Sequence, residues 1–230
     1  MRIVVLTGAG ISAESGIPTF RADDGLWEGH RVEDVATPEG FEADPDLVQE
    51  FYDARRRAAA SALPNAAHVA LARLEGAVGA DLLVVTQNVD DLHERAGSRR
   101  LVHMHGELER AQCQACGARP AWSRDLADRP PCPACGERML RPDVVWFGEM
   151  PYELDRIERA IAASDVFVSI GTSGAVYPAA GYVALASAFG ARTVELNLLP
   201  SAAVVPFDEV RAGRASIVVP EWVDEVIRRR

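Results

Sequence analysis

Short, continuous runs of apolar residues recur along the chain, and each run ends in a small or polar residue. Runs of this length, rich in Val, Ile and Leu, are typical of strands buried on both faces of a parallel sheet. The pattern predicts five strands, at Ile3–Thr7, Leu82–Thr86, Val166–Gly171, Thr193–Asn197 and Ser216–Val219.

Helical periodicity fills most of the stretches between these runs. The predicted helices cover Asp46–Ala60, Pro64–Glu75, Glu153–Ala163, Ala179–Phe189 and Glu221–Arg229. Strands that alternate with helices indicate an α/β fold, here a Rossmann-like parallel sheet with helices on both faces.

One stretch breaks this rhythm, because residues 107–142 lack clear periodicity, are rich in Pro and contain all four cysteines. We expect a small zinc-binding module there. The whole chain, 1–230, is predicted to be a single catalytic domain. Its parts are a Rossmann-like portion (1–30, 78–106 and 143–230), a helical insert (31–77) and a zinc-ribbon insert (107–142).

Composition narrows the possible chemistry. The 230 residues carry 34 Asp and Glu against 24 basic residues, a net charge of −10, and every basic residue is Arg. Without Lys there is no Walker A lysine and no Schiff-base lysine. The acidic balance argues against binding to nucleic acid.

No targeting or membrane segment is visible. The first apolar run stops at Gly8, which is too short for a signal peptide, and no run approaches the roughly 18 apolar residues of a membrane helix. We expect a cytoplasmic, monomeric protein that binds neither nucleic acid nor membranes.

A glycine-rich loop follows the first predicted strand. Gly8, Gly10 and Ala13 match G-x-G-x-x-A, in which small residues let the backbone approach a pyrophosphate. The acidic residue that usually follows about 20 residues later has no strand to carry it. The loop therefore indicates a nucleotide site, with a plain tight turn as the alternative.

The four cysteines form two C-x-x-C pairs, Cys113/Cys116 and Cys132/Cys135, each followed by Gly. Two such turns supply four thiolates for one tetrahedral zinc ion, and four cysteines leave no open position for catalysis. Disulfides and redox pairs are the alternatives, and a reducing compartment disfavours the first.

Polar residues follow three of the predicted strands. Gln87, Asn88 and Asp90 come after the second, Gly171–Ser173 after the third and Asn197 after the fourth. Ligands of open α/β sheets gather beyond the carboxyl ends of strands, so these residues are candidates for one shared site. A simple helix cap at Asn88 or Asp90 is the alternative.

The five histidines are the natural candidates for proton transfer near neutral pH. His68 falls inside a predicted helix and reads as structural, and His30 reads as exposed. His103 and His105 share one side of an extended segment before the zinc module. Local pattern does not choose between these two as the catalytic base.

Taken together, these motifs resemble one family, the sirtuins, which are NAD-dependent protein-lysine deacylases. The resemblance covers nearly the whole chain and lies in ordered motifs at Gly8–Arg21, Thr86–Asp90, His105-Gly106, the four cysteines, Arg141–Glu149 and Gly171–Ser173. It implies NAD as a consumed co-substrate, one structural zinc ion and acyl-lysine proteins or peptides as substrates.

The resemblance also implies residue roles. His105 matches the family's catalytic base because it directly precedes Gly, and His103 becomes a supporting residue. The substrate is expected to contact Tyr52, Arg55, Val145, Trp146, Phe147, Gly148 and Glu149. The residues expected around NAD are Gly8, Ala9, Gly10, Ser12, Ala13, Glu14, Pro18, Thr19, Phe20, Arg21, Trp27, Gln87, Asn88, Val89, Asp90, Gly171, Thr172, Ser173, Asn197, Leu198, Leu199 and Ala215.

One pair of residues indicates the acyl group. Tyr52 and Arg55 are three apart on a predicted helix, so they lie on one face, and a phenol with a guanidinium can bind a carboxylate. The pair resembles that of class III sirtuins, which accept succinyl- and malonyl-lysine. On the residues alone, a core tyrosine beside an exposed basic face is the favoured explanation.

The implied reaction removes acetyl and also succinyl or malonyl groups from lysine, giving nicotinamide, O-acyl-ADP-ribose and free lysine. His105 would accept a proton from a ribose hydroxyl. NAD-dependent ADP-ribosyl transfer to protein is the alternative, because it begins with the same departure of nicotinamide.

Overall fold

A computed structural model describes residues 1–19, 26–203 and 205–229. Its centre is a six-stranded sheet in the order β10-β9-β8-β1-β4-β5, and every neighbouring pair is parallel. The strands are β1 (Ile3–Thr7), β4 (Leu82–Thr86), β5 (Leu101–His103), β8 (Val166–Ile170), β9 (Arg192–Asn197) and β10 (Glu209–Ala212). The predicted Rossmann-like sheet is confirmed.

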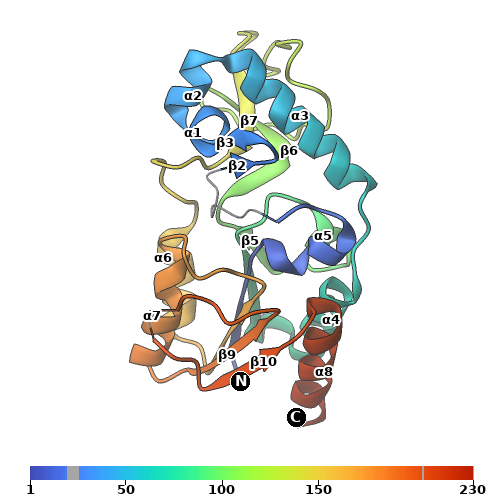
Figure 1. Cartoon of the computed structure of the whole chain (residues 1–230), viewed down its shortest axis with the longest axis vertical. Coiled ribbons are helices and arrows are strands. Elements are labelled where there is room, and N and C mark those ends of the chain that lie inside the picture. The colour runs from blue at the N-terminus through green and yellow to red at the C-terminus, as the bar shows by residue number, and fades with distance from the viewer. Residues whose placement is uncertain (20–25, 204, 230) are drawn as a thin grey trace.

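Helices cover both faces of the sheet (Figure 1). Ile3 and Val5 of β1 face the helices α4 (Ala66–Val78) and α8 (Ala215–Arg228). The intervening Val4 and Leu6 face α6 (Leu154–Ala162) and α7 (Tyr182–Ala188). Since successive side chains of a strand point to opposite faces, a run apolar at every position is what a sheet covered on both sides requires.

The prediction of a strand at Ser216–Val219 is wrong, because these residues lie in the first part of helix α8. The buried residues of this helix recur at helical spacing, from Ala215 through Val218 and Val219 to Trp222 and Val223. Pro220 lies inside this helix without ending it. The two edge strands, β5 and β10, were not predicted because neither sequence contains an apolar run of this length.

The other predicted helices are confirmed within a few residues, except that Ala179–Phe189 divides into a short 3₁₀ turn, η5 (Ala179–Gly181), and α7. The remaining short elements are η1 (Ala9–Ile11), η2 (Ala13–Ser15), η4 (Gly79–Asp81) and α5 (Leu92–Arg95). None of the helices in the described part of the chain is long and apolar enough to cross a membrane.

A second lobe lies beyond the carboxyl ends of the sheet (Figure 1). It contains the antiparallel pair β6 (Gly106–Cys113) and β7 (Leu140–Val144), with the predicted zinc module between the two strands. Its other elements are β2 (Leu26–Trp27), β3 (His30–Arg31), α1 (Val32–Val35), α2 (Pro38–Ala43) and α3 (Pro45–Ser61). An aromatic core holds this lobe together, in which Phe41, Phe51, Tyr52 and Trp146 are buried.

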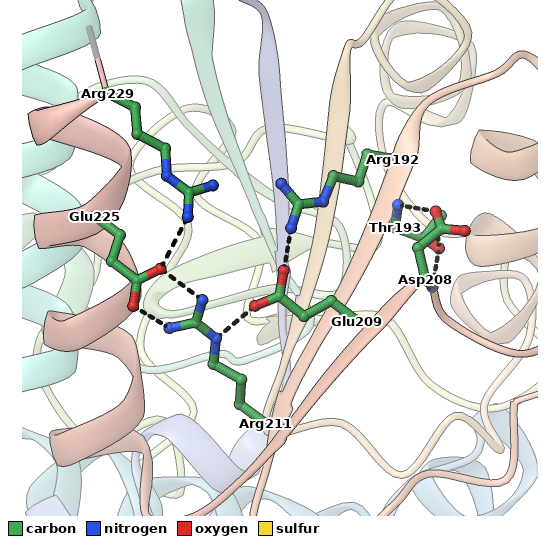
Figure 2. A network of polar contacts seen from close by, with 7 residues as sticks. All are labelled: Arg192, Thr193, Asp208, Glu209, Arg211, Glu225 and Arg229. Carbon is green, nitrogen blue, oxygen red and sulfur yellow. Dashed lines mark hydrogen bonds and ion pairs between the residues drawn. The ribbon is translucent and has the colours of Figure 1, made fainter.

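A chain of ion pairs fastens the edge strand β10 (Figure 2). Arg211 lies between Glu209 and Glu225, and its Nη2 is 2.8 Å from the Glu225 carboxylate. Arg192 pairs with Glu209 and Arg229 with Glu225. Charges of this kind stabilise an exposed edge strand and hinder its pairing with another chain.

Candidate active site

The carboxyl ends of the parallel strands meet at one edge of the sheet and carry the predicted site. Gly8 follows β1, Gln87 follows β4 and Gly171 follows β8. After β1, the next strands of the sheet, β4 and β5, are added on one side of it, and the later strands, β8 to β10, are added on the other side. The β1/β8 pair is therefore the point where strand order reverses, the usual place for a ligand in such a sheet.

The glycines of the first loop are required by the turn after β8. Gly8 and Gly10 donate backbone hydrogen bonds to the carbonyls of Ile170 and Gly171, at 3.0 and 2.8 Å. A Cβ atom added to Gly10 would lie 2.7 Å from the Gly171 Cα, closer than side chains pack. Close contact between two loops therefore explains these glycines, besides any approach of a pyrophosphate.

Ser12 is the centre of a buried polar network. Its hydroxyl donates to Asp90 Oδ2 at 3.0 Å and accepts from the Asn88 side-chain amide at 3.1 Å. Burial raises the pKa of Asp90, although the Leu92 amide and the Ser12 hydroxyl oppose the shift. The Ser12, Asn88 and Asp90 predicted from sequence thus come together, which simple helix capping does not explain.

Two histidines that the sequence did not assign to the site join this network. His68 Nε2 lies 3.4 Å from the Ser12 hydroxyl, and His93 Nε2 lies 3.1 Å from the Thr7 hydroxyl. The two imidazole rings also contact each other, with centroids 5.0 Å apart. Burial lowers the pKa of His68 to about 4, so both rings are neutral at pH 7. Helical spacing gave no signal for this contact, because it depends on how α4 packs against the glycine loop.

His105 has the geometry of a general base. Its Nδ1 lies 3.2 Å from the Gln87 carbonyl oxygen, so Nδ1 carries the proton and Nε2 keeps its lone pair. Burial lowers the pKa of His105, and the Gln87 carbonyl only partly offsets the effect. The ring is therefore neutral and ready to accept a proton at physiological pH.

Several of the residues predicted around NAD meet at Thr172. The Gln87 amide donates to the Thr172 hydroxyl at 3.1 Å, and the Asn197 amide donates to the Thr172 carbonyl at 2.8 Å. Next to this cluster Ser173, Leu198 and Leu199 are exposed and accessible to a ligand.

Glu14 has a partner within the chain. Its carboxylate accepts hydrogen bonds from the Ser216 amide and hydroxyl, at 2.9 and 2.8 Å. Ser216 lies at the start of α8, where Ala215, another residue predicted around NAD, is the first helical residue. Glu14 therefore fastens the glycine loop to the N-terminus of α8.

The other predicted cofactor residues occupy different surroundings. Ala9 and Ala13 lie in the turns η1 and η2, and Pro18 and Thr19 follow them. Val89 accepts a backbone hydrogen bond from Leu108 at 2.8 Å. Phe20 and Arg21 lie outside the described residues.

Trp27 belongs to the second lobe. Its ring lies edge-on to those of Phe51 and Tyr52, at 5.0 and 6.1 Å between centroids. The guanidinium of Arg55 lies 4.7 Å from the Trp27 ring. The structure therefore places Trp27 with the predicted acyl-binding pair, although the sequence assigned it to the cofactor.

Tyr52 and Arg55 lie in the same aromatic cluster. Tyr52 is fully buried, and its hydroxyl accepts a hydrogen bond from Trp146 Nε1 at 3.1 Å. Burial raises the pKa of Tyr52. The Arg55 guanidinium lies 3.3 Å from the centre of the Phe51 ring and donates from Nη1 to the Phe51 carbonyl.

The outer nitrogen of Arg55 is poorly satisfied. Arg55 Nη2 is buried and has no hydrogen-bond partner among the described residues, with Glu28 Oε2 at 3.9 Å as its nearest acidic group. Burial lowers the pKa of Arg55 to about 10, although the charge of Glu28 partly offsets the effect. A buried cation with an unused donor is a ready partner for a carboxylate.

The segment predicted to meet the substrate peptide runs between the two lobes. Val145 donates its backbone N–H to the His105 carbonyl, and Phe147 donates to the Ala36 carbonyl, both at 2.9 Å. The Glu149 carboxylate accepts from the Trp146 amide and pairs with Arg141. Phe147 and Gly148 are exposed, so this segment combines an anchored backbone with an accessible apolar side chain.

The four cysteines form a metal centre of the predicted kind. Their sulfur atoms all lie within 4.8 Å of one another, with Cys113 to Cys135 at 3.7 Å and Cys116 to Cys132 at 3.9 Å. Sulfurs bound at about 2.3 Å around a tetrahedral zinc ion lie about 3.8 Å apart. The four thiols therefore fit one zinc ion, with no position left for a substrate.

Comparison with known proteins agrees with this geometry. Residues 8–178 match the model of the Sir2 family. A protein of Yersinia pseudotuberculosis named NAD-dependent protein deacylase is 58% identical over 228 residues, which cover 98% of this chain and 82% of that protein. A Sir2 homologue in complex with ADP-ribose superimposes with a TM-score of 0.91 at 41% identity, over 99% of this chain and 92% of that one. A variant Sir2 homologue in complex with 2′-O-acetyl-ADP-ribose gives a TM-score of 0.89 at 40% identity, with the same coverage.

Proposed function

The chain belongs to the Sir2 family of NAD-dependent protein deacylases, and from this premise we propose that it removes succinyl and malonyl as well as acetyl groups from lysine side chains. NAD is the co-substrate that it consumes. The products expected from this chemistry are nicotinamide, free lysine and O-acyl-ADP-ribose. A Sir2 homologue of similar structure binds an O-acetyl-ADP-ribose of this kind.

The main support for activity on succinyl- and malonyl-lysine comes from the surroundings of the Arg55 guanidinium. Its Nη2 is buried without a hydrogen-bond partner among the described residues, and its guanidinium stacks on the Phe51 ring. A succinyl or malonyl carboxylate would satisfy this donor and offset the cost of burying the charge. An acetyl group offers no acceptor at that position.

Tyr52 would support the same acyl carboxylate. Its hydroxyl accepts from Trp146 Nε1, so its own proton is available for donation. Burial keeps Tyr52 protonated at physiological pH. The phenol and the guanidinium would thus both donate to one carboxylate, and Trp27 would close the apolar side of the acyl site.

His105 would act as the general base on a ribose hydroxyl of NAD. The Gln87 carbonyl fixes the Nδ1–H tautomer, and burial keeps the ring neutral. The ring atom that would accept the proton is therefore Nε2. Ser12, Asn88 and Asp90 would hold the nicotinamide end of NAD through the amide, hydroxyl and carboxylate groups of their network.

The glycine loop and the turn after β8 would hold the rest of the dinucleotide. Gly8, Gly10 and Gly171 let these two loops pack closely together at the end of the sheet where such ligands bind. Asn197, Leu198 and Leu199 would contact the adenosine half, next to the first residues of α8.

Zinc would have a structural role in this enzyme. Four thiolates at tetrahedral spacing close the ion's coordination and hold the module between β6 and β7. Cysteines that bind a metal ion instead of forming disulfides are typical of a reducing compartment, which supports a cytoplasmic location. The monomeric state stays a prediction, and light scattering on the purified protein tests it.

One panel of substrates tests the proposal. Acetyl-, malonyl- and succinyl-lysine peptides of the same sequence are incubated with NAD and the products are identified by mass. We expect all three peptides to be deacylated, with a matching O-acyl-ADP-ribose for each. Turnover of the acetyl peptide alone would refute the dicarboxylic specificity, and a peptide that gains ADP-ribose would indicate the alternative transferase reaction.

A further inference from the structure

The segment Leu101–Gly106 carries two histidines that contact adjacent carbonyls of one loop. His103 Nδ1 lies 3.1 Å from the Asn88 carbonyl oxygen, and His105 Nδ1 lies 3.2 Å from that of Gln87. The second nitrogen distinguishes them. His103 Nε2 lies 2.7 Å from Glu94 Oε1, whereas among the described residues His105 Nε2 has no partner.

The partners of His103 determine its number of protons. A backbone carbonyl and an ionised carboxylate can only accept hydrogen bonds, so both ring nitrogens of His103 must donate. An imidazole with a proton on each nitrogen is a cation. His103 is therefore an imidazolium with 9% of its side chain exposed, two residues away from the neutral ring of His105.

A metal ion is the other explanation for this cluster, because Glu94, His103 and Glu107 bring three ligand atoms within 4.8 Å. Two ligands bound at about 2.1 Å around a tetrahedral zinc ion lie about 3.4 Å apart. The His103 to Glu94 distance of 2.7 Å is shorter and matches a charge-assisted hydrogen bond. An ion pair accounts for the geometry without a metal.

We propose that His103, held as an imidazolium by Glu94, is a positioning residue that fixes the loop 87–90 at the nicotinamide end of the NAD site. The position of the Asn88 carbonyl determines where its side chain lies. That side chain donates to the Ser12 hydroxyl at 3.1 Å, and Ser12 donates to Asp90 at 3.0 Å. The exposed Glu94 is thus linked through His103 to the buried network of the site.

The charge matters because a neutral imidazole has two tautomers, whereas the cation has a proton on both nitrogens. Neutral His103 can place its only proton on Nε2, and Nδ1 then presents a lone pair to the Asn88 carbonyl and repels it. The imidazolium always has a proton on Nδ1, and its hydrogen bond is about twice as strong as a neutral one. Protonation of His103 therefore keeps the loop in one position.

The charged groups around His103 favour this state. Burial alone lowers the pKa of His103, but the hydrogen bond and charge of Glu94 on α5, the charge of Glu107 on β6 and the Asn88 carbonyl outweigh it and raise the pKa. Asp90, in the loop after β4, interacts favourably with the same cation. His93 on α5 is neutral and adds no opposing charge.

The charge of His103 can be measured without any activity, by following the histidine ring nitrogens of the full chain by NMR as the pH is changed. We expect His103 to titrate above the ordinary pKa of histidine in the wild type. In Glu94→Ala the pKa falls, whereas the control Glu107→Ala, which removes a nearby charge but no hydrogen bond to His103, lowers it less. A wild-type His103 that is neutral at pH 7, or a second zinc ion bound per chain, would overturn the assignment.

Kinetics then test the positioning role, which rests on the proposed function. In Glu94→Ala, kcat/KM for NAD is expected to approach that of the wild type once the pH is low enough to protonate His103 in both proteins. At a pH between the two His103 pKa values measured by NMR, it should be about 2- to 10-fold lower, the effect of weakening one hydrogen bond. Identical pH profiles in both proteins would refute the positioning role while leaving the charge of His103 established. An inactive wild type would instead count against the proposed function.

Discussion

Replacing Arg55 by Met separates the acyl carboxylate from the rest of catalysis. Met keeps an apolar side chain against Phe51 and Trp27 but removes the cation and its unused donor. The Arg55 side chain is 16% exposed, so its interaction with a carboxylate is largely shielded from water. A hydrogen bond to a charged group contributes about 1.5–3 kcal/mol, which corresponds to roughly a 10- to 150-fold loss of kcat/KM on succinyl-lysine.

The same change should matter little for acetyl-lysine, which has no carboxylate. Among the described residues, the ion pair lost is the one with Glu28 at 3.9 Å, and because Glu28 is 39% exposed this pair contributes less than about 1 kcal/mol. Arg57→Met is the matched control, because Arg57 is on the same helix, is 60% exposed and pairs with Asp125. The assay compares kcat/KM on succinyl and acetyl peptides for the three proteins. An equal loss on both peptides in Arg55→Met would refute a carboxylate-binding role.

Three further predictions follow from the site and its surroundings. Burial lowers the pKa of His105, and His105 must be neutral to act as a base. The His105 contribution to kcat/KM should therefore be constant at alkaline pH and fall as the pH drops through the lowered pKa. A kcat/KM that rises only above pH 7.5 would contradict the assignment. Removing zinc with a chelator should release about one ion per chain and lower the melting temperature, and a metal-free protein of unchanged stability would refute the structural role. Asp53→Asn should lower the free energy of unfolding, measured with denaturant, by about 3–5 kcal/mol. The reason is that the buried Asp53 carboxylate pairs with Arg56 and accepts hydrogen bonds from the backbone amides of Leu126 and Ala127. A loss below about 1 kcal/mol would show that these contacts are dispensable.

The parts of the fold that sequence predicts well are those where one physical requirement dominates. The central strands at Ile3–Thr7 and Leu82–Thr86 match the structure residue for residue, because burial on both faces leaves only apolar residues acceptable. Ser216–Val219 has the same composition but lies on a helix. Four residues do not reveal their period, and here the apolar positions further along, at Trp222 and Val223, decide the structure.

The site is only partly predictable for a related reason. Family motifs identify Ser12, Asn88 and Asp90, but the contact of His68 with Ser12 depends on how α4 packs against the glycine loop. Likewise, no local pattern distinguishes the charged His103 from the neutral His105. Their difference comes from Glu94, which α5 brings to one ring and not to the other.

The most direct test of the central claim is a crystal structure with NAD and a succinyl-lysine peptide bound. We expect the succinyl carboxylate to lie within about 3 Å of Arg55 Nη2 and the Tyr52 hydroxyl. We also expect His105 Nε2 to face a hydroxyl of the nicotinamide ribose. A carboxylate that points to solvent, away from Arg55, would contradict the proposed specificity.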